Sequence, residues 1–134
     1  MKRQGGFTLI EMIVVIVILG ILAVTAAPKF LSLEKEAKAG TLKGIEAAIV
    51  SAASMAHGVL LLNPTTDEFT DIHQYPTADA GGIGKLVSVS DDLTVKALTD
   101  VGYVWSYSDT CYAGYQAPAE ANAEPTYPSD TSGC

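Results

Sequence analysis

The sequence predicts an α+β fold, with a long N-terminal α-helix, a small antiparallel β-sheet and a C-terminal loop bounded by two cysteines. Three observations predict it. An apolar run covers residues 7–27, a one-sided apolar stripe follows beyond Pro28, and the segment GYVWSYS at 102–108 alternates with a period of two. The first two patterns are typical of helices, and the third is typical of a strand with one buried face.

The apolar run is long enough to cross a membrane. Between Phe7 and Ala27 only Glu11 is charged. A helix of this length measures about 31 Å, and the hydrocarbon core of a bilayer is about 30 Å thick. The competing interpretation is a cleaved secretory signal, whose apolar core is about 7–15 residues long and ends at small residues, as 24–27 do here. The length favours a retained span.

Two residues weaken the second half of this helix. Pro28 removes a backbone hydrogen bond and crowds the preceding turn, so a kink or a break is expected there. Gly20 is a second weak point. Residues 20–28 are therefore the least secure part of the helix.

Beyond Pro28 the apolar residues lie on one face. They follow one another at spacings of three and four, which predicts an amphipathic helix ended by Asn63-Pro64. The stripe consists of Leu42, Ile45, Ile49, Ala52, Ala56 and Val59.

The rest of the chain reads as a polar connection and a small sheet. Residues 63–76 form the connection. For 77–98 two readings stay open: Thr77 caps a short helix containing Ile83, Leu86 and Val87, or the segment forms a hairpin turning at Asp91-Asp92. The strand at 102–108 is expected to pair with CYAGYQA, and the chain from Pro118 onward reads as irregular loop.

Charge excludes one class of partner. The formal net charge is −7, and the chain from Pro64 onward holds eleven acids and two lysines. Such a surface repels phosphate backbones, so no nucleic-acid partner is expected. No nucleophile–base pattern, phosphate loop or metal motif occurs, so neither an enzyme nor a cofactor is expected.

Other chemically interesting residues are expected to be structural. His57 and His73 have no cysteine nearby, and Asp91-Asp92 reads as a turn rather than a calcium site. An aromatic set at alternate strand positions is expected to pack on the helix rather than bind sugar. That set is Tyr103, Trp105 and Tyr107.

Glu11 is the residue with the strongest functional pattern. An acid costs about 2.5–3.5 kcal/mol at the centre of a membrane helix and less near its end. Either Glu11 reaches interfacial water, or it meets a positive partner. The nearest candidate partner is an amine on Phe7 of a neighbouring chain, which would exist only after a cut between Gly6 and Phe7.

The segment GGFTLIEMIVVIVILGILAVTAAPKF resembles the N-terminal signature of type IV pilins, and of type IVa pilins in particular. The resemblance implies that residues 1–6 are a cytoplasmic leader, which a prepilin peptidase removes after Gly6 before methylating Phe7. Residues 7–28 would be the transmembrane and assembly helix, and 29–134 the periplasmic, later extracellular, head. The precursor would lie in the bacterial inner membrane and the product in a pilus on the cell surface.

The resemblance also implies a structural function and its partners. The subunit would polymerise with copies of itself into a helical filament on an inner-membrane assembly platform, for attachment through a cell-surface or glycan receptor. Glu11 would pair with the Phe7 amine of the adjacent subunit, and Gly20–Pro28 resembles the segment that loses helicity in filaments. The alternatives are a pseudopilin of a type II secretion system and a single-span membrane adaptor or sensor.

Cys111 and Cys134 are expected to form a disulfide. The export that the resemblance implies would place them in an oxidising compartment, where disulfides persist. The segment between them has almost no large aliphatic side chains, so a covalent bond is the available restraint on the tail. Residues 111–134 are thus the predicted exposed recognition region.

Overall fold

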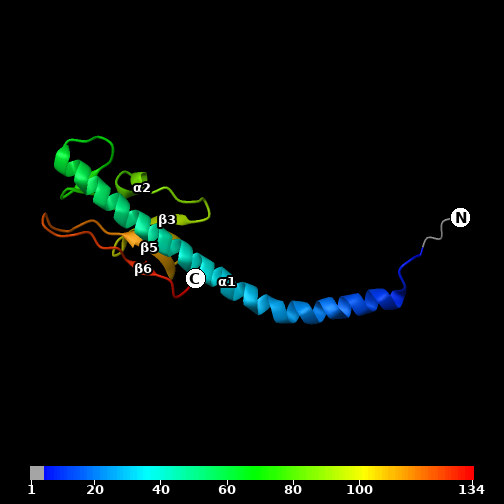
Figure 1. Ribbon diagram of the computed structural model, residues 1–134. Helices are drawn as coiled ribbons and strands as arrows, with labels where there is room; N and C mark the ends of the chain where they lie inside the picture. Colours follow the sequence, from blue (N-terminus) through cyan, green and yellow to red (C-terminus); the bar gives the residue numbers. More distant parts are fainter. Residues whose placement is uncertain (1–4) are drawn as a thin grey trace. The chain divides into compact units, whose positions relative to one another are not determined.

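The computed structural model describes residues 5–134, so the predicted leader lies largely outside the described residues. The chain forms two compact units, one ending at Lys35 and the other covering Glu36–Cys134. The helices and strands are α1 (Leu9–Leu62), β1 (Asp71–Ile72), β2 (Tyr75–Pro76), α2 (Ile83–Leu86), β3 (Thr94–Leu98), β4 (Gly102–Ser108), β5 (Cys111–Tyr115) and β6 (Ser129–Asp130). Figure 1 labels α1, α2, β3, β5 and β6.

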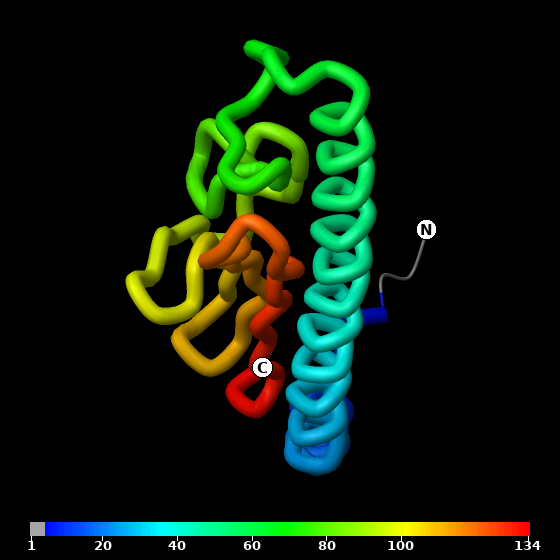
Figure 2. Tube along the Cα trace, turned by 90° about the vertical axis from the view of Figure 1, so that its left-hand side faces the viewer, coloured from blue at the N-terminus to red at the C-terminus, as the bar shows by residue number. Residues whose placement is uncertain are grey.

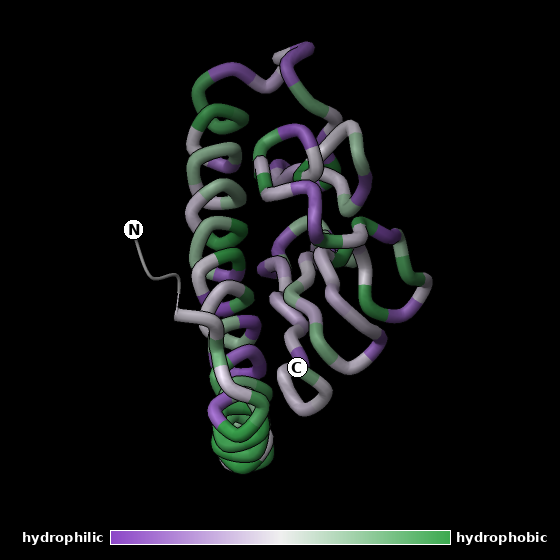
Figure 3. Tube along the Cα trace, turned by 90° about the vertical axis from the view of Figure 1, so that its right-hand side faces the viewer, coloured by the Kyte–Doolittle hydropathy of each residue, from purple (hydrophilic) through white to green (hydrophobic). Residues whose placement is uncertain are grey.

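The first unit is the N-terminal part of α1, and it has no core. Its large apolar side chains are exposed, from Leu9 at 77% to Leu33 at 58%. Figure 3 shows the apolar colouring of this part of the helix. Helix continues through Gly20 and Pro28, so the break considered at Pro28 is not found. The proline removes one hydrogen bond, and the helix-forming alanines before it keep the neighbouring turns.

The second unit packs a sheet against the remainder of α1. The four-stranded sheet has the antiparallel order β3-β4-β5-β6, and β1 and β2 form a separate hairpin. In Figure 2 the strands and loops of this unit lie along one side of its helix. Leu42, Ile45 and Ile49 enter one core with Trp105, as the predicted α+β arrangement requires. A smaller cluster joins Ala56 and Leu60 to Phe69.

The predicted apolar stripe is confirmed at Leu42, Ile45, Ile49 and Ala56, and it is displaced by one residue at its other two positions. The helix buries Ala53 and Leu60, whereas the prediction placed Ala52 and Val59 on the stripe. Val59 is 39% exposed. A heptad falls short of two full helical turns by about 20°, so alternating steps of three and four drift away from the core. Ala53 and Leu60, each one position further along the helix than predicted, again face the core.

Residues 77–98 follow neither reading completely. A short helix exists, but its N-cap is Gly82, which makes no side-chain cap bond, so the predicted cap at Thr77 is wrong. The Thr77 carbonyl instead accepts the Ile83 N–H. The hairpin at Asp91-Asp92 is also wrong, because β3 pairs with β4 and not with the residues before Asp91. Strand pairing with β4 outweighs the local turn signal.

The predicted hairpin of β4 and β5 is confirmed, with Tyr103 opposite Tyr115 and Trp105 opposite Ala113. The tail is less irregular than expected, because β6 pairs with β5 and Gln116 bridges Thr126. The disulfide between Cys111 and Cys134 is confirmed, with an S–S distance of 2.00 Å. It fastens the end of the chain to a buried strand residue.

Candidate processing and assembly site

The start of α1 forms a reciprocal cap between Thr8 and Glu11. One carboxylate oxygen of Glu11, Oε2, accepts the Thr8 backbone N–H at 2.8 Å and the Thr8 hydroxyl at 2.9 Å. In return the Thr8 hydroxyl oxygen accepts the Glu11 N–H at 3.3 Å. This is a capping box, which satisfies N–H groups that the first turn of a helix leaves without partners.

Thr8 is the residue that the sequence interpretation missed. The pattern T-x-x-E directly before an apolar run is a readable signature of a helix start. Glu11 therefore has a local structural role beside the proposed intersubunit one. The two roles are compatible, because a carboxylate has about four acceptor positions and the cap uses one oxygen atom.

The two glycines before Phe7 are not required by this chain's own structure. A Cβ atom built on Gly5 or Gly6 would meet no heavy atom within 4 Å. Both glycines are exposed, and Phe7 is 83% exposed. Side chains at these two positions would therefore meet nothing within the described chain.

The residues on either side of Glu11 are apolar and exposed. Ile10 is 71% exposed and Met12 is 54% exposed. Gly20 is similarly open, because a Cβ there would touch nothing within 4 Å. The surface around Glu11 offers apolar contact to a membrane or another helix, with one carboxylate as its distinguishing group.

The residues expected to be structural lie in the second unit. Trp105 is 1% exposed in the core, so the packing interpretation is confirmed and the sugar-binding surface is not formed there. His57 lies on α1, His73 in the turn between β1 and β2, and Asp91 before β3. Within residues 5–134, no three His, Cys, Asp or Glu side chains gather as a metal site would require.

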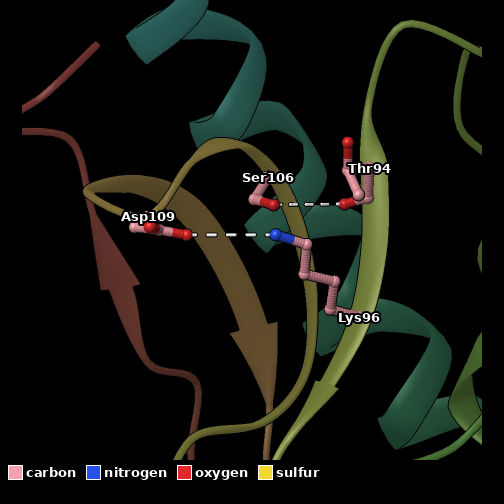
Figure 4. A network of polar contacts seen from close by, with 4 residues as sticks. All are labelled: Thr94, Lys96, Ser106 and Asp109. Atoms are coloured by element: carbon pink, nitrogen blue, oxygen red, sulfur yellow. Dashed lines mark hydrogen bonds and ion pairs between the residues drawn. The ribbon is translucent and has the colours of Figure 1, made fainter.

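The outer face of the sheet carries a polar network, shown in Figure 4. The Ser106 hydroxyl donates to the Thr94 carbonyl at 3.2 Å, and Lys96 Nζ lies 3.9 Å from the Asp109 carboxylate. The Asp109 side chain is 99% exposed, so solvent screens this ion pair. These contacts join β3, β4 and the turn before β5 without forming a reactive site.

Residues 1–27 match the profile of the prokaryotic N-terminal methylation motif. The chain carries this methylation motif. The matched residues include the glycine pair, Phe7 and the capped Glu11. Within the described residues, α1 alone is long and apolar enough to cross a membrane.

Two curated relatives share this N-terminal region. The chain is 48% identical over 54 residues to the type II secretion system core protein G of Pseudomonas aeruginosa, covering 40% of this chain and 38% of that protein. It is 41% identical over 66 residues to the type IV narrow pilus major component PilA5 of Thermus thermophilus, covering 49% of this chain and 57% of that protein. No solved structure matches.

The aligned parts make up 38% and 57% of the length of these two relatives, so the chain spans about half the length of the curated relatives it matches. The N-terminal region is pilin-like, in a sense that covers both pilus subunits and secretion-system pseudopilins.

Proposed function

We propose that the chain is the precursor of a type IV pilus subunit. Cleavage of the Gly6–Phe7 bond frees an amine on Phe7, which is then methylated. The subunits assemble into a surface filament through their apolar helices, and the head serves attachment. The observation that carries the proposal is an unburied apolar run, residues 7–27, whose single acid follows a glycine pair that the chain's own structure does not require.

Glu11 sets the register between subunits in this proposal. Oε2 stays in the cap with Thr8, and the second oxygen receives the Phe7 amine of the adjacent subunit. Desolvation offsets much of the attraction in such a pair, so its value lies in selecting one register rather than in raising stability. The prepilin peptidase, copies of this chain and the inner-membrane platform are the proposed partners.

A pseudopilin is the second candidate, because the relative with 48% identity belongs to a type II secretion system. The disulfide-bound tail favours the pilus, since it fixes a loop on the head for exposed recognition. Within type IVa pilins we propose the mannose-sensitive haemagglutinin type, which MKRQGGFTLIE resembles. Long surface filaments containing this chain support the pilus, and their absence from secreting cells favours the pseudopilin.

Three variants test the role of Glu11 separately from its cap. Glu11→Gln removes the charge and keeps a residue that also serves at this capping position. Thr8→Val removes the cap hydroxyl and keeps the charge. Glu11→Val removes both. We expect Glu11→Gln and Glu11→Val to insert in the membrane but to lose filament yield, and Thr8→Val to assemble.

The measurement is the quantity of sheared surface filament relative to membrane-bound subunit. Normal filament yield from Glu11→Gln would refute the charge pairing. A loss in Thr8→Val equal to that in Glu11→Gln would assign the effect to the helix start instead. Replacing Gly6 by a bulky residue is expected to trap the uncut precursor in the membrane.

A further inference from the structure

A hollow of about 310 Å³ lies in the second unit where α1, β2 and the tail meet. Its lining includes Ser54, His57, Tyr75, Glu124 and Tyr127. A second hollow of about 270 Å³ shares His57, Tyr75 and Glu124 with the first. The three shared residues therefore border a continuous stretch of concave surface on the head.

The Tyr75 side chain, which lines both hollows, is held in place by His57. The two rings are stacked, with centroids 4.2 Å apart and planes inclined by 8°. His57 Nδ1 lies 2.7 Å from the Gln74 carbonyl oxygen. Because a carbonyl only accepts, Nδ1 carries the hydrogen in this bond.

That hydrogen bond reaches an unusual turn. His73 and Gln74 have φ values of 53° and 66°, which suits the two-residue turn of a twisted hairpin but is a region that side chains other than glycine seldom adopt. The bond from His57 helps to hold the turn, and the turn sets the start of β2. The Tyr75 ring is thus positioned before any ligand arrives, which lowers the entropic cost of binding.

The hollow is aromatic and negative. Glu124 supplies the charge, and among the described lining residues of both hollows there is no lysine or arginine. Burial, Tyr75 and Glu124, in that order, raise the pKa of Tyr127, so this phenol stays neutral beside the carboxylate. The chain from Pro64 onward holds eleven acids and two lysines, which adds attraction for cations.

We propose that this hollow binds an organic cation, an ammonium or guanidinium group, against the rings of Tyr75 and Tyr127 and the carboxylate of Glu124. Tyrosine ring faces attract cations through their quadrupole, and a neighbouring carboxylate adds direct charge attraction. The negative charge disfavours an anion. A cation is also better matched than an uncharged sugar, because the Glu124 carboxylate lies in the same lining as the two rings.

The test uses the full chain in detergent at pH 8. Three probes are titrated while the ring signals of labelled tyrosines are followed by NMR. They are N-acetyl-lysine methylamide, tetramethylammonium chloride and the uncharged N-acetyl-norleucine methylamide. We expect saturable shifts at Tyr75 and Tyr127 with the lysine probe and none with the norleucine probe.

Glu124→Gln is expected to weaken binding by about three- to fivefold, the range for a partly exposed charge pair. Glu120→Gln is the matched control, because Glu120 is an exposed acid of the same tail that does not line either hollow. Unchanged Trp105 emission in both variants would show that the core is intact.

The two cationic probes distinguish the source of the cation. Binding of the lysine probe alone indicates a hydrogen-bonding side chain from a protein partner. Binding of both indicates that small free organic cations also enter, without a need for hydrogen bonds from the cation. Equal shifts with the norleucine probe, shifts that never saturate, or full affinity in Glu124→Gln would each overturn the proposal.

Discussion

Between Leu9 and Lys35, α1 leaves its large apolar side chains exposed, whereas between Leu42 and Leu60 the same helix buries an apolar residue on every turn. Ile16 is 60% exposed, and Ile49 is fully buried. Both residues are isoleucines, so the difference in exposure comes from their surroundings. The second unit contains a sheet that covers its part of the helix, whereas the described part of the first unit contains nothing that covers Ile16.

Burial of apolar surface stabilises by roughly 25 cal/mol per Å². The described part of the first unit makes no such gain within the chain, and we propose that lipid or other chains cover its apolar surface. The second unit makes this gain internally. In this proposal the helix has one segment for assembly and one for folding, and experiments that treat the segments separately test this division.

Separating the segments is expected to have the largest effect. A chain covering residues 29–134 should be soluble without detergent, because it lacks the exposed apolar run, whereas the full chain should need detergent or membrane. Trp105 is 1% exposed, so its emission in the fragment should be blue-shifted as in a buried indole. An emission maximum like that of indole in water would contradict a self-sufficient second unit.

Truncation of one isoleucine in each unit should change the free energy of unfolding of the head by different amounts. Ile49→Ala is expected to lower the free energy of unfolding of the head by about 2–5 kcal/mol, because it leaves a cavity in the core. Ile16→Ala, in the exposed segment of the same helix, should leave it unchanged. Urea unfolding of the full chain in mild detergent, followed by Trp105 emission, gives both values. Similar losses in the two variants would remove the distinction.

Removing the disulfide should have a smaller effect, confined to the second unit. Replacing both Cys111 and Cys134 by serine is expected to cost about 3 kcal/mol, since the bond closes a loop with a sequence separation of 23. Limited proteolysis should then cut the tail first. Unchanged stability and an uncut tail would show that strand pairing of β6 suffices to hold it.

Replacement of Asp79 is expected to have the smallest effect of these changes on the free energy of unfolding. Burial acts to raise its pKa, but hydrogen bonds from Gly82, Thr77, Gly81 and Thr70 outweigh it and lower the pKa below the usual 3.8. Because the pKa of Asp79 is lower in the folded state than in the unfolded state, its charge stabilises the fold at pH values above the unfolded-state pKa. This contribution to the free energy of unfolding is lost as the pH falls through the folded-state pKa. Asp79→Asn should cost about 1 kcal/mol at pH 7, allowing for solvent screening.

The pH dependence gives the check on Asp79. The difference between wild type and Asp79→Asn should shrink as the pH falls below about 4, because the wild-type carboxylate then becomes protonated. Asp91→Asn is the control, since Asp91 is an exposed acid outside this hydrogen-bonded loop. A constant difference between wild type and Asp79→Asn from pH 7 to pH 3 would argue against a role for the charge.

Local patterns predicted the elements that local patterns control. The apolar run, the strand around Trp105 and its hairpin partner were readable from periodicity. The cysteine pair was readable from the implied export and from the lack of large aliphatic residues between the two cysteines. The Thr8 cap was readable but missed. The strand β6 was not readable, because two residues with no apolar pattern pair only where β5 offers an edge.

Long-range contacts decided the remainder. The turn at His73-Gln74 lacks the Asn-Gly signal of such turns, and its carbonyl is held by His57 from a distant part of α1. Asp91-Asp92 carries a turn signal, yet β3 takes β4 as its partner. In each case a contact with a residue outside the local segment determines the backbone conformation, which the local sequence alone does not predict.

The central claim is that the first unit becomes an assembly element by cleavage after Gly6. The most direct test is the intact mass and N-terminal sequence of the chain recovered from sheared surface filaments. The proposal predicts a chain that begins at N-methylated Phe7 and retains the disulfide between Cys111 and Cys134. Filaments built from chains that still begin at Met1, or a Phe7 amine without a methyl group, would contradict it.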